Sequence, residues 1–328
     1  AVVDKFKREN LLSYTVDEVI VSNGAKQVLF NAMMATLEQD DEVLICAPYF
    51  GQYKDIVLIL GGQPLALKCP AENGFRVTPE QLEGGITPKT RWIMLNLPSN
   101  PAGAVYSDDD LRALGSVLEK YPNILLLSDE IYEHILFDGR QFRSFASANP
   151  SLKDRTLTVN GVSKAYAMTG WRIGYGAGPN PLIAAMTKVQ SQICSGACAI
   201  AQAAAAAALN GPQDDVRAFC RAFEERRDLV VARVSQIDGL TLDPPGGAFY
   251  GLIGCSNLIG AQTEEGETLS DDGEVTAYFL KDAGIAAVPG SAYELSPFFR
   301  ISTAASLDVL GHAIDRIAAS VAKLKRKT

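Results

Sequence analysis

Short apolar runs alternate with longer amphipathic segments over the first half of the chain. Each short run has the length and aliphatic content of a buried strand, and each amphipathic segment repeats its apolar positions at helical spacing. Strands that alternate with helices in this way are typical of a mostly parallel sheet with helices on both faces. The predicted strands are 19–21, 42–46, 64–67, 91–95, 124–127, 156–159 and 173–178, and the predicted helices include 28–37, 55–60 and 108–121.

The pattern changes after Gly211 and Pro212. Residues 181–209 are predicted to be helical and to end the first part of the chain. We therefore predict an α/β large domain over residues 1–211 and a smaller α+β domain over residues 212–328. The predicted elements of the second part are a helix at 214–237, a strand opening at 246–250, a helix at 275–283, strands at 285–288 and 298–302, a helix at 307–324, and a mobile acidic loop at 260–273.

Composition and charge narrow the class of protein. The chain has 328 residues, of which 47% are apolar and 21% charged, as in globular proteins large enough for two domains. The net charge is −8, and the single basic run, 323–327, is expected to extend the last helix, so a nucleic-acid partner is disfavoured. The apolar run 193–209 is mostly alanine with polar interruptions, and no signal peptide is evident, so no membrane association is expected.

The cysteines and histidines predict no metal site. Among the six cysteines, Cys194 and Cys198 are near neighbours, without the second ligand pair that a zinc site needs. Two histidines, His134 and His312, are too few for a histidine-rich site. Reduced, buried thiols in a cytoplasmic protein are the expected reading.

One stretch, residues 163–175, combines a lysine with an arginine eight residues later, among small residues. The amine of Lys164 can form an imine with a carbonyl if burial lowers its pKa, and the planar fork of Arg172 suits a phosphate. A cofactor with an aldehyde at one end and a phosphate at the other, pyridoxal 5′-phosphate, would use both. The alternative is a surface lysine and a structural arginine on a turn.

Four strand ends carry further candidates. The turn at Gly24 leads from a strand into a helix start, where free backbone N–H groups favour an anion, although a simple helix cap is the alternative. Phe50 follows the next strand and either stacks on a flat ligand or joins the core. Asn100 lies in a turn made rigid by two prolines, at the end of a strand where α/β proteins bind ligands. Asp129 leaves an apolar strand and needs a partner, and Tyr132 can face the same side.

These motifs resemble those of the class I and II aminotransferases, in particular the bacterial aspartate aminotransferase-like subgroup with pyridoxal-phosphate fold type I. Residues 163–175 match S-K-x-x-x-x-x-G-x-R-x-G-Y, and the resemblance extends over nearly the whole chain. It implies that Lys164 is the Schiff-base lysine, which also moves the substrate α-proton, and that Arg172 binds the cofactor phosphate. It further implies these roles: Asp129 pairs with the pyridine nitrogen, Tyr132 and Asn100 donate to the 3-oxygen, Gly24, Ala25 and Lys26 form the phosphate cup, Phe50 stacks on the ring, and Arg300 grips the substrate carboxylate.

The chain departs from the family pattern at three places. Gly161 stands where many members carry a phosphate-binding serine, and Phe50 replaces the more usual tryptophan. The family's N-terminal segment, with its substrate-contacting glycine and a tyrosine that reaches the neighbouring subunit, is expected to be missing. The resemblance implies a homodimer with sites at the interface.

Three functions follow from these residues. The first is an aminotransferase that moves an amino group between an amino acid and a 2-oxo acid. The alternatives are a lyase or decarboxylase of the same fold and a non-catalytic pyridoxal-phosphate sensor domain. Lys26, in G-A-K-Q, either meets the distal carboxylate of a dicarboxylic substrate or is only a lysine at a helix start. The expected substrates are aspartate and glutamate, with prephenate or aromatic substrates as alternatives.

Overall fold

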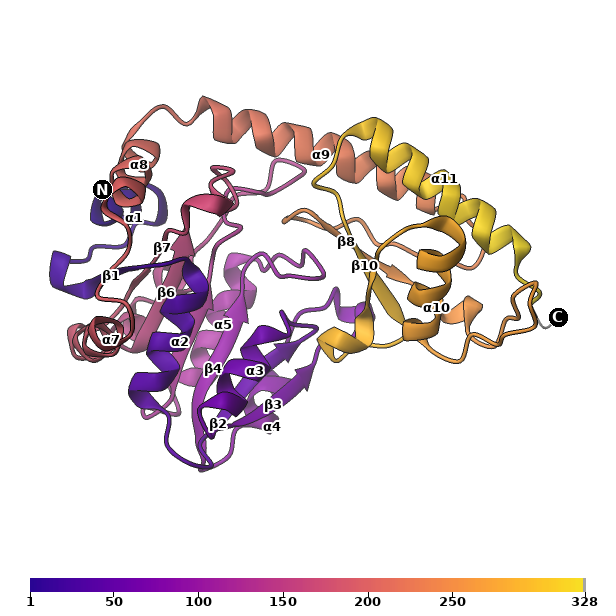
Figure 1. Ribbon diagram of the computed structural model, residues 1–328. Helices are drawn as coiled ribbons and strands as arrows, with labels where there is room; N and C mark the ends of the chain where they lie inside the picture. Colours follow the sequence, from indigo (N-terminus) through magenta and orange to yellow (C-terminus); the bar gives the residue numbers. More distant parts are fainter. Residues whose placement is uncertain (327–328) are drawn as a thin grey trace.

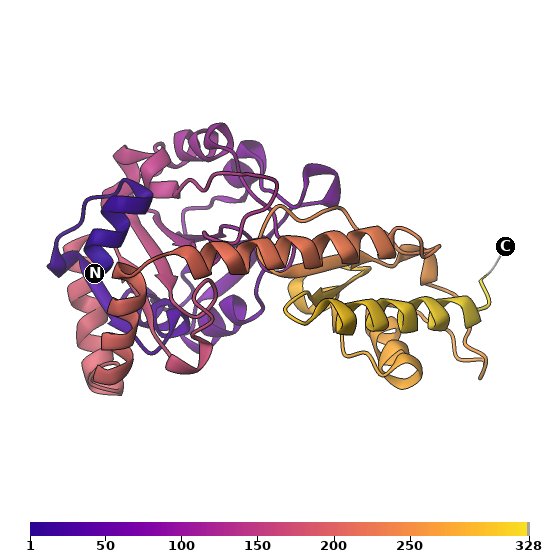
Figure 2. The same cartoon turned by 90° about the horizontal axis from the view of Figure 1, so that it is seen from above.

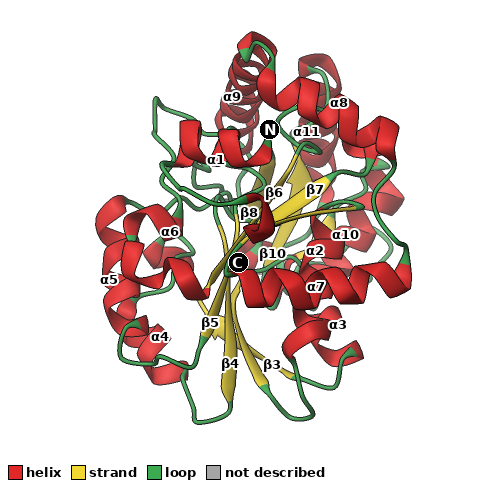
Figure 3. Ribbon diagram, turned by 90° about the vertical axis from the view of Figure 1, so that its left-hand side faces the viewer, coloured by secondary structure: helices red, strands yellow, loops and turns green. Residues whose placement is uncertain are grey.

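A seven-stranded sheet forms the centre of the larger part of the molecule (Figures 1 and 3). The computed structural model describes residues 1–326. Its strand order is β1-β7-β6-β5-β4-β2-β3, and the neighbours from β6 through β5, β4 and β2 to β3 are parallel, which confirms the α/β fold with a mostly parallel sheet. The strands are β1 (Val19–Ser22), β2 (Glu42–Ala47), β3 (Gln63–Lys68), β4 (Thr90–Asn96), β5 (Leu125–Asp129), β6 (Thr156–Gly161) and β7 (Gly174–Ala177).

Strand β7 runs antiparallel to both of its neighbours, β1 and β6. The segment between β6 and β7 holds a short 3₁₀ turn, Thr169–Trp171, and no crossover helix. A parallel return needs a crossover, so the chain folds back antiparallel instead. The stretch that contains Lys164 and Arg172 is therefore a loop at one end of the sheet.

Helices cover both faces of this sheet, as the sequence predicted. On β2 the side chains alternate: Val43 and Ile45 pack under α2, α3 and α7, whereas Leu44 packs under α4, α5 and α6. The predicted helix 181–209 is in fact two helices, because Ser195 adopts a left-handed backbone (φ 61°) beside Gly196. The helices are α1 (Val2–Asn10), α2 (Ala25–Thr36), α3 (Gln52–Ile59), α4 (Pro79–Gly85), α5 (Asp108–Leu118), α6 (Phe145–Ala148), α7 (Asn180–Ile193) and α8 (Ala199–Asn210).

A second, smaller sheet is connected to the first by a long helix, α9 (Asp214–Val234), which runs from one unit to the other (Figure 2). Phe223 of α9 packs against the first core, and Val230 and Val234 lie in the second, so the predicted division at 211/212 falls just before a helix that both units share. The small sheet is antiparallel with order β8-β10-β9. Its elements are β8 (Tyr250–Gly254), β9 (Val288–Pro289), β10 (Phe298–Ser302), α10 (Asp272–Tyr278) and α11 (Leu307–Lys323).

Several predictions for the second part were wrong in detail. The strand expected at 285–288 is reduced to β9, and the helix expected at 275–283 starts at Asp272 and ends in a π-helical turn, Phe279–Ala283. In the predicted mobile loop, the backbone of Gln262 pairs with both Thr268 and Lys325. Helix α11 ends at Lys323, so the basic run leaves the helix instead of extending it. Lys327, the last residue of that run, lies outside the described residues.

The cysteines differ in their burial. Cys69 and Cys255 are buried, as predicted, but Cys198 is exposed at the break between α7 and α8. Within residues 1–326, no helix combines the length and hydropathy required to cross a membrane.

Candidate active site

Nine of the predicted site residues line one cavity of about 270 Å³, beyond the carboxyl ends of β4, β5 and β6. Gly24, the tenth, precedes the cavity at the start of α2. The cavity also receives residues of the small sheet, so both units build it. The predicted residues in the lining are Ala25, Lys26, Phe50, Asn100, Asp129, Tyr132, Lys164, Arg172 and Arg300.

Asp129, the last residue of β5, is a buried carboxylate with two hydrogen-bond donors. Its Oδ2 accepts from the Tyr53 hydroxyl at 2.6 Å, and its Oδ1 accepts from the Ile131 N–H at 3.3 Å. Burial raises the pKa of Asp129, and the two hydrogen bonds and the charge of Lys164 oppose this rise. A cationic group placed in the cavity would complete the pairing that this carboxylate requires.

Lys164 lies three residues beyond β6, and its amine faces two aromatic rings. Its Nζ is 5.6 Å from the ring centroid of Tyr132 and 5.5 Å from that of Phe249. Burial lowers the pKa of Lys164; Asp129 opposes the shift, while the charges of Arg300, Arg172 and Lys26 add to it. A lowered pKa makes the neutral, nucleophilic amine available nearer to neutral pH.

An anion cup is formed where β1 turns into α2. Gly24 has φ 89°, and a Cβ at this position would lie 2.5 Å from Nη2 of Arg172. Arg172 is itself held by hydrogen bonds from Nη1 to the Thr169 carbonyl (2.9 Å) and from Nη2 to the Asn23 carbonyl (3.4 Å). The first turn of α2, with its backbone N–H groups, thus lies beside a guanidinium, an arrangement that suits a phosphate.

Gly161 has a steric reason to differ from the serine of many family members. A Cβ at this position would lie 2.9 Å from the carbonyl oxygen of Ile173 and 3.1 Å from the Cα of Gly174. The close approach of β6 and β7 at this point therefore leaves no room for a side chain.

Arg300, on β10, reaches the cavity from the small sheet. Its Nη1 donates to Asn100 Oδ1 at 2.8 Å, and its guanidinium lies 4.4 Å from the ring centroid of Tyr250 and 5.1 Å from that of Tyr293. Its Nε is buried and has no hydrogen-bond partner among residues 1–326. A buried donor in this state is expected to bind an acceptor such as a ligand carboxylate.

Two further sets of polar groups in the lining are hydrogen-bonded to one another. The Asn96 side-chain amide donates to the Asp129 carbonyl at 2.9 Å, and its Oδ1 accepts from the Asn100 N–H at 2.7 Å. The hydroxyls of Tyr132 and Tyr250 are 2.9 Å apart. Burial holds the pKa of Tyr132 well above its usual value, so its hydroxyl keeps its proton and is available as a donor.

Phe50 and Lys26 form the rim opposite Tyr132. The Nζ of Lys26 lies 5.7 Å from the Phe50 ring centroid, and Phe50 meets Tyr53 edge to face at 5.7 Å. The ring of Phe50 thus lines the cavity and is also in contact with the first core.

Sequence reasoning assigned no role to five polar residues of the lining: Tyr53, Asn96, Ser163, Thr169 and Tyr250. Ser163 and Thr169 lie within the stretch 163–175 that the sequence singled out. Tyr53 follows Phe50 by three residues, a spacing that places both on one side of a helical turn and gave a usable signal. Tyr250 opens β8 in the other unit, and no local pattern links it to Tyr132, which lies 118 residues away.

The charged cluster of Glu9, Glu133 and His134 lies outside this cavity. One ligand atom of each comes close enough to the others to share a metal ion. However, the ammonium group of Lys5 already contacts both carboxylates, at 3.7 Å in the case of Glu9. The negative charge that a cation would require is therefore compensated within the protein.

The lining fits a flat cofactor that carries a phosphate, an aldehyde and a pyridine nitrogen. The cup at Ala25 and Arg172 offers N–H donors for the phosphate, and Asp129 offers a buried acceptor for a protonated ring nitrogen. The amine of Lys164 lies within the same cavity, where it can reach the aldehyde.

Comparisons with known proteins agree with this fit. The family described as aminotransferase class I and II matches residues 1–317. The chain is 54% identical to an aspartate aminotransferase of Rhizobium meliloti strain 1021 over 324 residues, covering 99% of this chain and 79% of that protein. It is 49% identical to an aspartate/prephenate aminotransferase of Cereibacter sphaeroides, covering 99% and 81%.

Solved structures give the same similarity. The crystal structure of the aspartate aminotransferase from Rhizobium meliloti superposes with a TM-score of 0.97 at 53% identity, covering 99% of this chain and 81% of that one. The aspartate aminotransferase from Thermus thermophilus with maleate superposes with a TM-score of 0.89 at 39% identity, covering 97% and 80%.

Proposed function

The chain belongs to the class I and II aminotransferases, which use pyridoxal 5′-phosphate, and from this premise we propose that it is an aspartate aminotransferase whose catalytic amine is Lys164. The observation that carries the site assignment is the meeting of Lys164, Asp129 and Arg172 around one cavity. Asp129 ends β5, whereas Lys164 and Arg172 lie in the loop between β6 and β7, so the meeting of the carboxylate with the two cations is a property of the fold.

The proposed roles follow from the chemistry of each group. When bound, the cofactor supplies a ring that accepts electrons from the substrate Cα. Asp129 holds the proton on the ring nitrogen, because its buried negative charge favours the cationic form of that nitrogen. Lys164, as a free amine, moves the proton at the substrate Cα. Arg172, with the backbone N–H groups after Gly24, holds the phosphate.

Four further side chains would set the orientation of the ring and of the substrate. Tyr132 and Asn100 donate to the 3-oxygen of the cofactor; Asn100 has its amide N–H₂ free for this, since its Oδ1 is used by Arg300. Arg300 grips the substrate α-carboxylate with its fork and its unpartnered Nε. Phe50 stacks on the ring face. Together these side chains would hold the substrate in one orientation relative to the amine of Lys164.

The charges of the cavity support a dicarboxylic substrate. Its lining holds four cationic side chains, Lys26, Lys164, Arg172 and Arg300, against the one carboxylate of Asp129. Arg172 serves the phosphate, Arg300 the α-carboxylate, and Lys164 is the catalytic amine, which leaves Lys26 for a distal carboxylate of aspartate or glutamate. Prephenate is the second candidate substrate, because it is also a dicarboxylate and a relative at 49% identity is an aspartate/prephenate aminotransferase.

We also propose that the chain forms a homodimer. Support comes from large apolar side chains that are exposed near the cup: Trp171, next to Arg172, is 47% exposed, and Ile193, at the end of α7, is 54% exposed. Light scattering at micromolar concentration checks the assembly. The cytoplasmic location expected from the thiols stays a prediction.

The reaction itself can be tested with the cofactor-loaded protein. On addition of aspartate, the visible absorbance of the bound cofactor should fall while one equivalent of a 2-oxo acid forms, and 2-oxoglutarate should restore it with formation of glutamate. Lys164→Ala should abolish both half-reactions. Release of carbon dioxide or of a side-chain fragment would support the lyase alternative, and a spectrum unchanged by any amino acid would contradict the aminotransferase assignment.

A further inference from the structure

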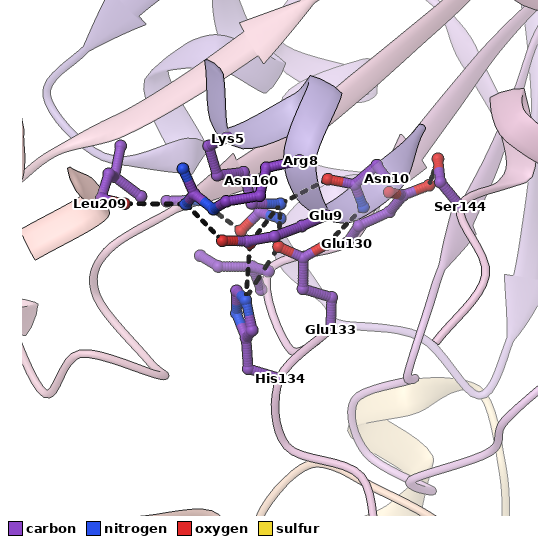
Figure 4. Close-up of polar contacts among 12 residues, drawn as sticks. Lys5, Arg8, Glu9, Asn10, Glu130, Glu133, His134, Ser144, Asn160 and Leu209 are labelled. Atoms are coloured by element: carbon purple, nitrogen blue, oxygen red, sulfur yellow. Dashed lines mark hydrogen bonds and ion pairs between the residues drawn. The ribbon is translucent and has the colours of Figure 1, made fainter. Parts of the chain in front are cut away.

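A buried charge cluster connects helix α1 with the turn that follows β5 (Figure 4). Lys5 and Asn10 come from α1, and Glu133 belongs to the turn itself. The side chain of Lys5 is fully buried and that of Glu133 is 3% exposed. A buried ammonium group is stable only where it is paired and hydrogen-bonded. Lys5 therefore requires its contact with Glu133.

Both oxygens of Glu133 are held by α1. Lys5 Nζ donates to Glu133 Oε1 and, at 2.7 Å, to Asn10 Oδ1. The Asn10 side-chain amide in turn donates to Glu133 Oε2 at 2.7 Å. The ammonium, the amide and the carboxylate thus form a closed ring of hydrogen bonds, which fixes Glu133 more firmly than a single ion pair would.

Other titratable groups surround this ring. His134 lies 3.6 Å from Glu133 through Nδ1 and 3.0 Å from Glu9 through Nε2. Burial raises the pKa of Glu9, but the hydrogen bond with His134 and the charge of Lys5 outweigh burial and lower that pKa to about 2. Glu133 remains ionised next to Lys5, because the charges of Lys5 and His134 outweigh the effect of burial on its pKa.

The ring is connected to the cavity through a tight turn. The Glu133 N–H donates to the Glu130 carbonyl at 3.0 Å, and the Ile135 N–H donates to the Tyr132 carbonyl at 2.8 Å. Tyr132 and Glu133 are consecutive, and their side chains reach opposite sides: Tyr132 lines the cavity and Glu133 meets α1. A change in the position of Glu133 therefore changes the direction in which the Tyr132 hydroxyl points.

We propose that Lys5 is a positioning residue for the active site: through Glu133 it fixes the turn that directs the Tyr132 hydroxyl into the cavity. This inference rests on the proposed role of Tyr132 as a donor to the cofactor 3-oxygen. Helix α1 suits the task, because its buried residues are Lys5, Phe6 and Asn10, and two of these three hold Glu133.

The test uses the pH midpoint of the visible absorbance of the cofactor-loaded protein. A donor to the 3-oxygen stabilises its anionic form and so lowers this midpoint. Tyr132→Phe should raise the midpoint by on the order of one pH unit. Lys5→Met should raise it in the same direction by about half a unit or more, and should add nothing in the Tyr132→Phe background, because its effect passes through that hydroxyl.

A second variant keeps the proposal testable if the unpaired carboxylate of Lys5→Met prevents folding. In Lys5→Met/Glu133→Gln no unpaired buried charge remains, but the contact of residue 5 with the turn is still lost, so the same rise is expected. Lys153→Met is the control: the Lys153 side chain is partly buried, lies over the ring of Tyr14 and pairs with Glu18 at 3.4 Å, away from the turn. It should leave the midpoint unchanged.

The outcomes separate the two proposals. A wild-type midpoint in folded Lys5→Met or in the double variant, with Tyr132→Phe shifted, would overturn the role of Lys5 alone. A wild-type midpoint in Tyr132→Phe would overturn the role proposed for the hydroxyl, and with it the inference. Additive shifts of Lys5→Met and Tyr132→Phe would show that Lys5 acts by another route.

Discussion

The Tyr53 hydroxyl donates a hydrogen bond of 2.6 Å to Oδ2 of Asp129, and both groups are buried. The two residues lie 76 positions apart, on α3 and at the end of β5. Burial and the neighbouring Asp129 charge hold the pKa of Tyr53 well above its usual value, so the phenol keeps its proton and acts as donor. The Tyr53 hydroxyl thus orients the Asp129 carboxylate, and the Ile131 N–H donates to its second oxygen.

Removal of this hydroxyl should weaken the reaction without unfolding the chain. In Tyr53→Phe the ring still fills its place, but Asp129 loses a charge-assisted hydrogen bond of about 1.5–3 kcal/mol. We expect kcat/KM for aspartate to fall roughly 10- to 100-fold, since each tenfold change corresponds to about 1.4 kcal/mol. Steady-state kinetics at neutral pH measure this change.

A matched control is available for Tyr53→Phe. Tyr278 donates to the Ser320 carbonyl at 2.9 Å in the small unit, far from the cavity lining. Tyr278→Phe should lower the unfolding temperature without affecting kcat/KM. If both variants lost activity in proportion to their lost stability, the specific role of Tyr53 would be refuted.

Replacement of Arg300 by lysine should mainly affect substrate binding. Lysine keeps the charge but loses the planar fork, the contacts with the rings of Tyr250 and Tyr293, and the Nε donor. We expect KM for aspartate to rise at least tenfold and kcat/KM to fall about 100-fold, on the basis of about 2–3 kcal/mol for a charge-assisted contact. Arg233→Lys, at an ion pair with Asp315 on the surface, is the control and should behave like wild type.

The proposed contact of Lys26 with the distal carboxylate should make the protein prefer dicarboxylic over neutral substrates. In Lys26→Ala we expect the ratio of kcat/KM for aspartate to that for alanine to fall roughly tenfold, the effect of losing one ion pair of about 1.4 kcal/mol. Turnover of alanine should change little. Lys54→Ala removes an exposed lysine that pairs with Glu294 and does not line the cavity, so its ratio should stay at the wild-type value. An unchanged ratio in Lys26→Ala would leave this lysine with a role at the helix start or the phosphate.

Glu130 should make the stability of the protein fall as pH rises. Burial, with the charge of Glu133, raises the pKa of Glu130 from 4.5 to about 8, although three donors oppose the shift. Between these pH values the folded chain binds a proton that the unfolded chain has lost, so the stability contributed by this group is present below pH 4.5 and is lost as pH rises toward 8. The loss is on the order of 1 kcal/mol per pH unit within that window.

Glu130→Gln tests this dependence because the amide stays neutral. Relative to wild type, the variant should gain stability from pH 5 to pH 8, with the difference levelling off above that range. Urea unfolding of the cofactor-free protein at several pH values measures the difference. A difference that is constant with pH would mean that Glu130 is ionised throughout the range in the folded state.

The sequence alone was sufficient for the strands of the large sheet and for the fold class. Apolar runs at strand length and helices at 3.6-residue spacing reproduced the seven strands of the large sheet to within a few residues, because these patterns reflect burial on a pleated or helical surface. Local patterns did not predict where the backbone leaves a regular helix. At Ser195 a left-handed conformation splits the predicted helix 181–209. The two-residue strand β9 is likewise defined by its partner β10 and not by its own residues.

The tertiary structure decided which polar groups meet. Lys164 and Arg172 could be recognised together because they share one short stretch, but the contacts of Tyr53 with Asp129 and of Lys5 with Glu133 join residues 76 and 128 positions apart. A local pattern carries no information about such pairs, since a lysine in a short amphipathic helix is most often solvated. Only the packing of α1 against the turn after β5 removes water from Lys5, and that loss of water is what makes its partner obligatory.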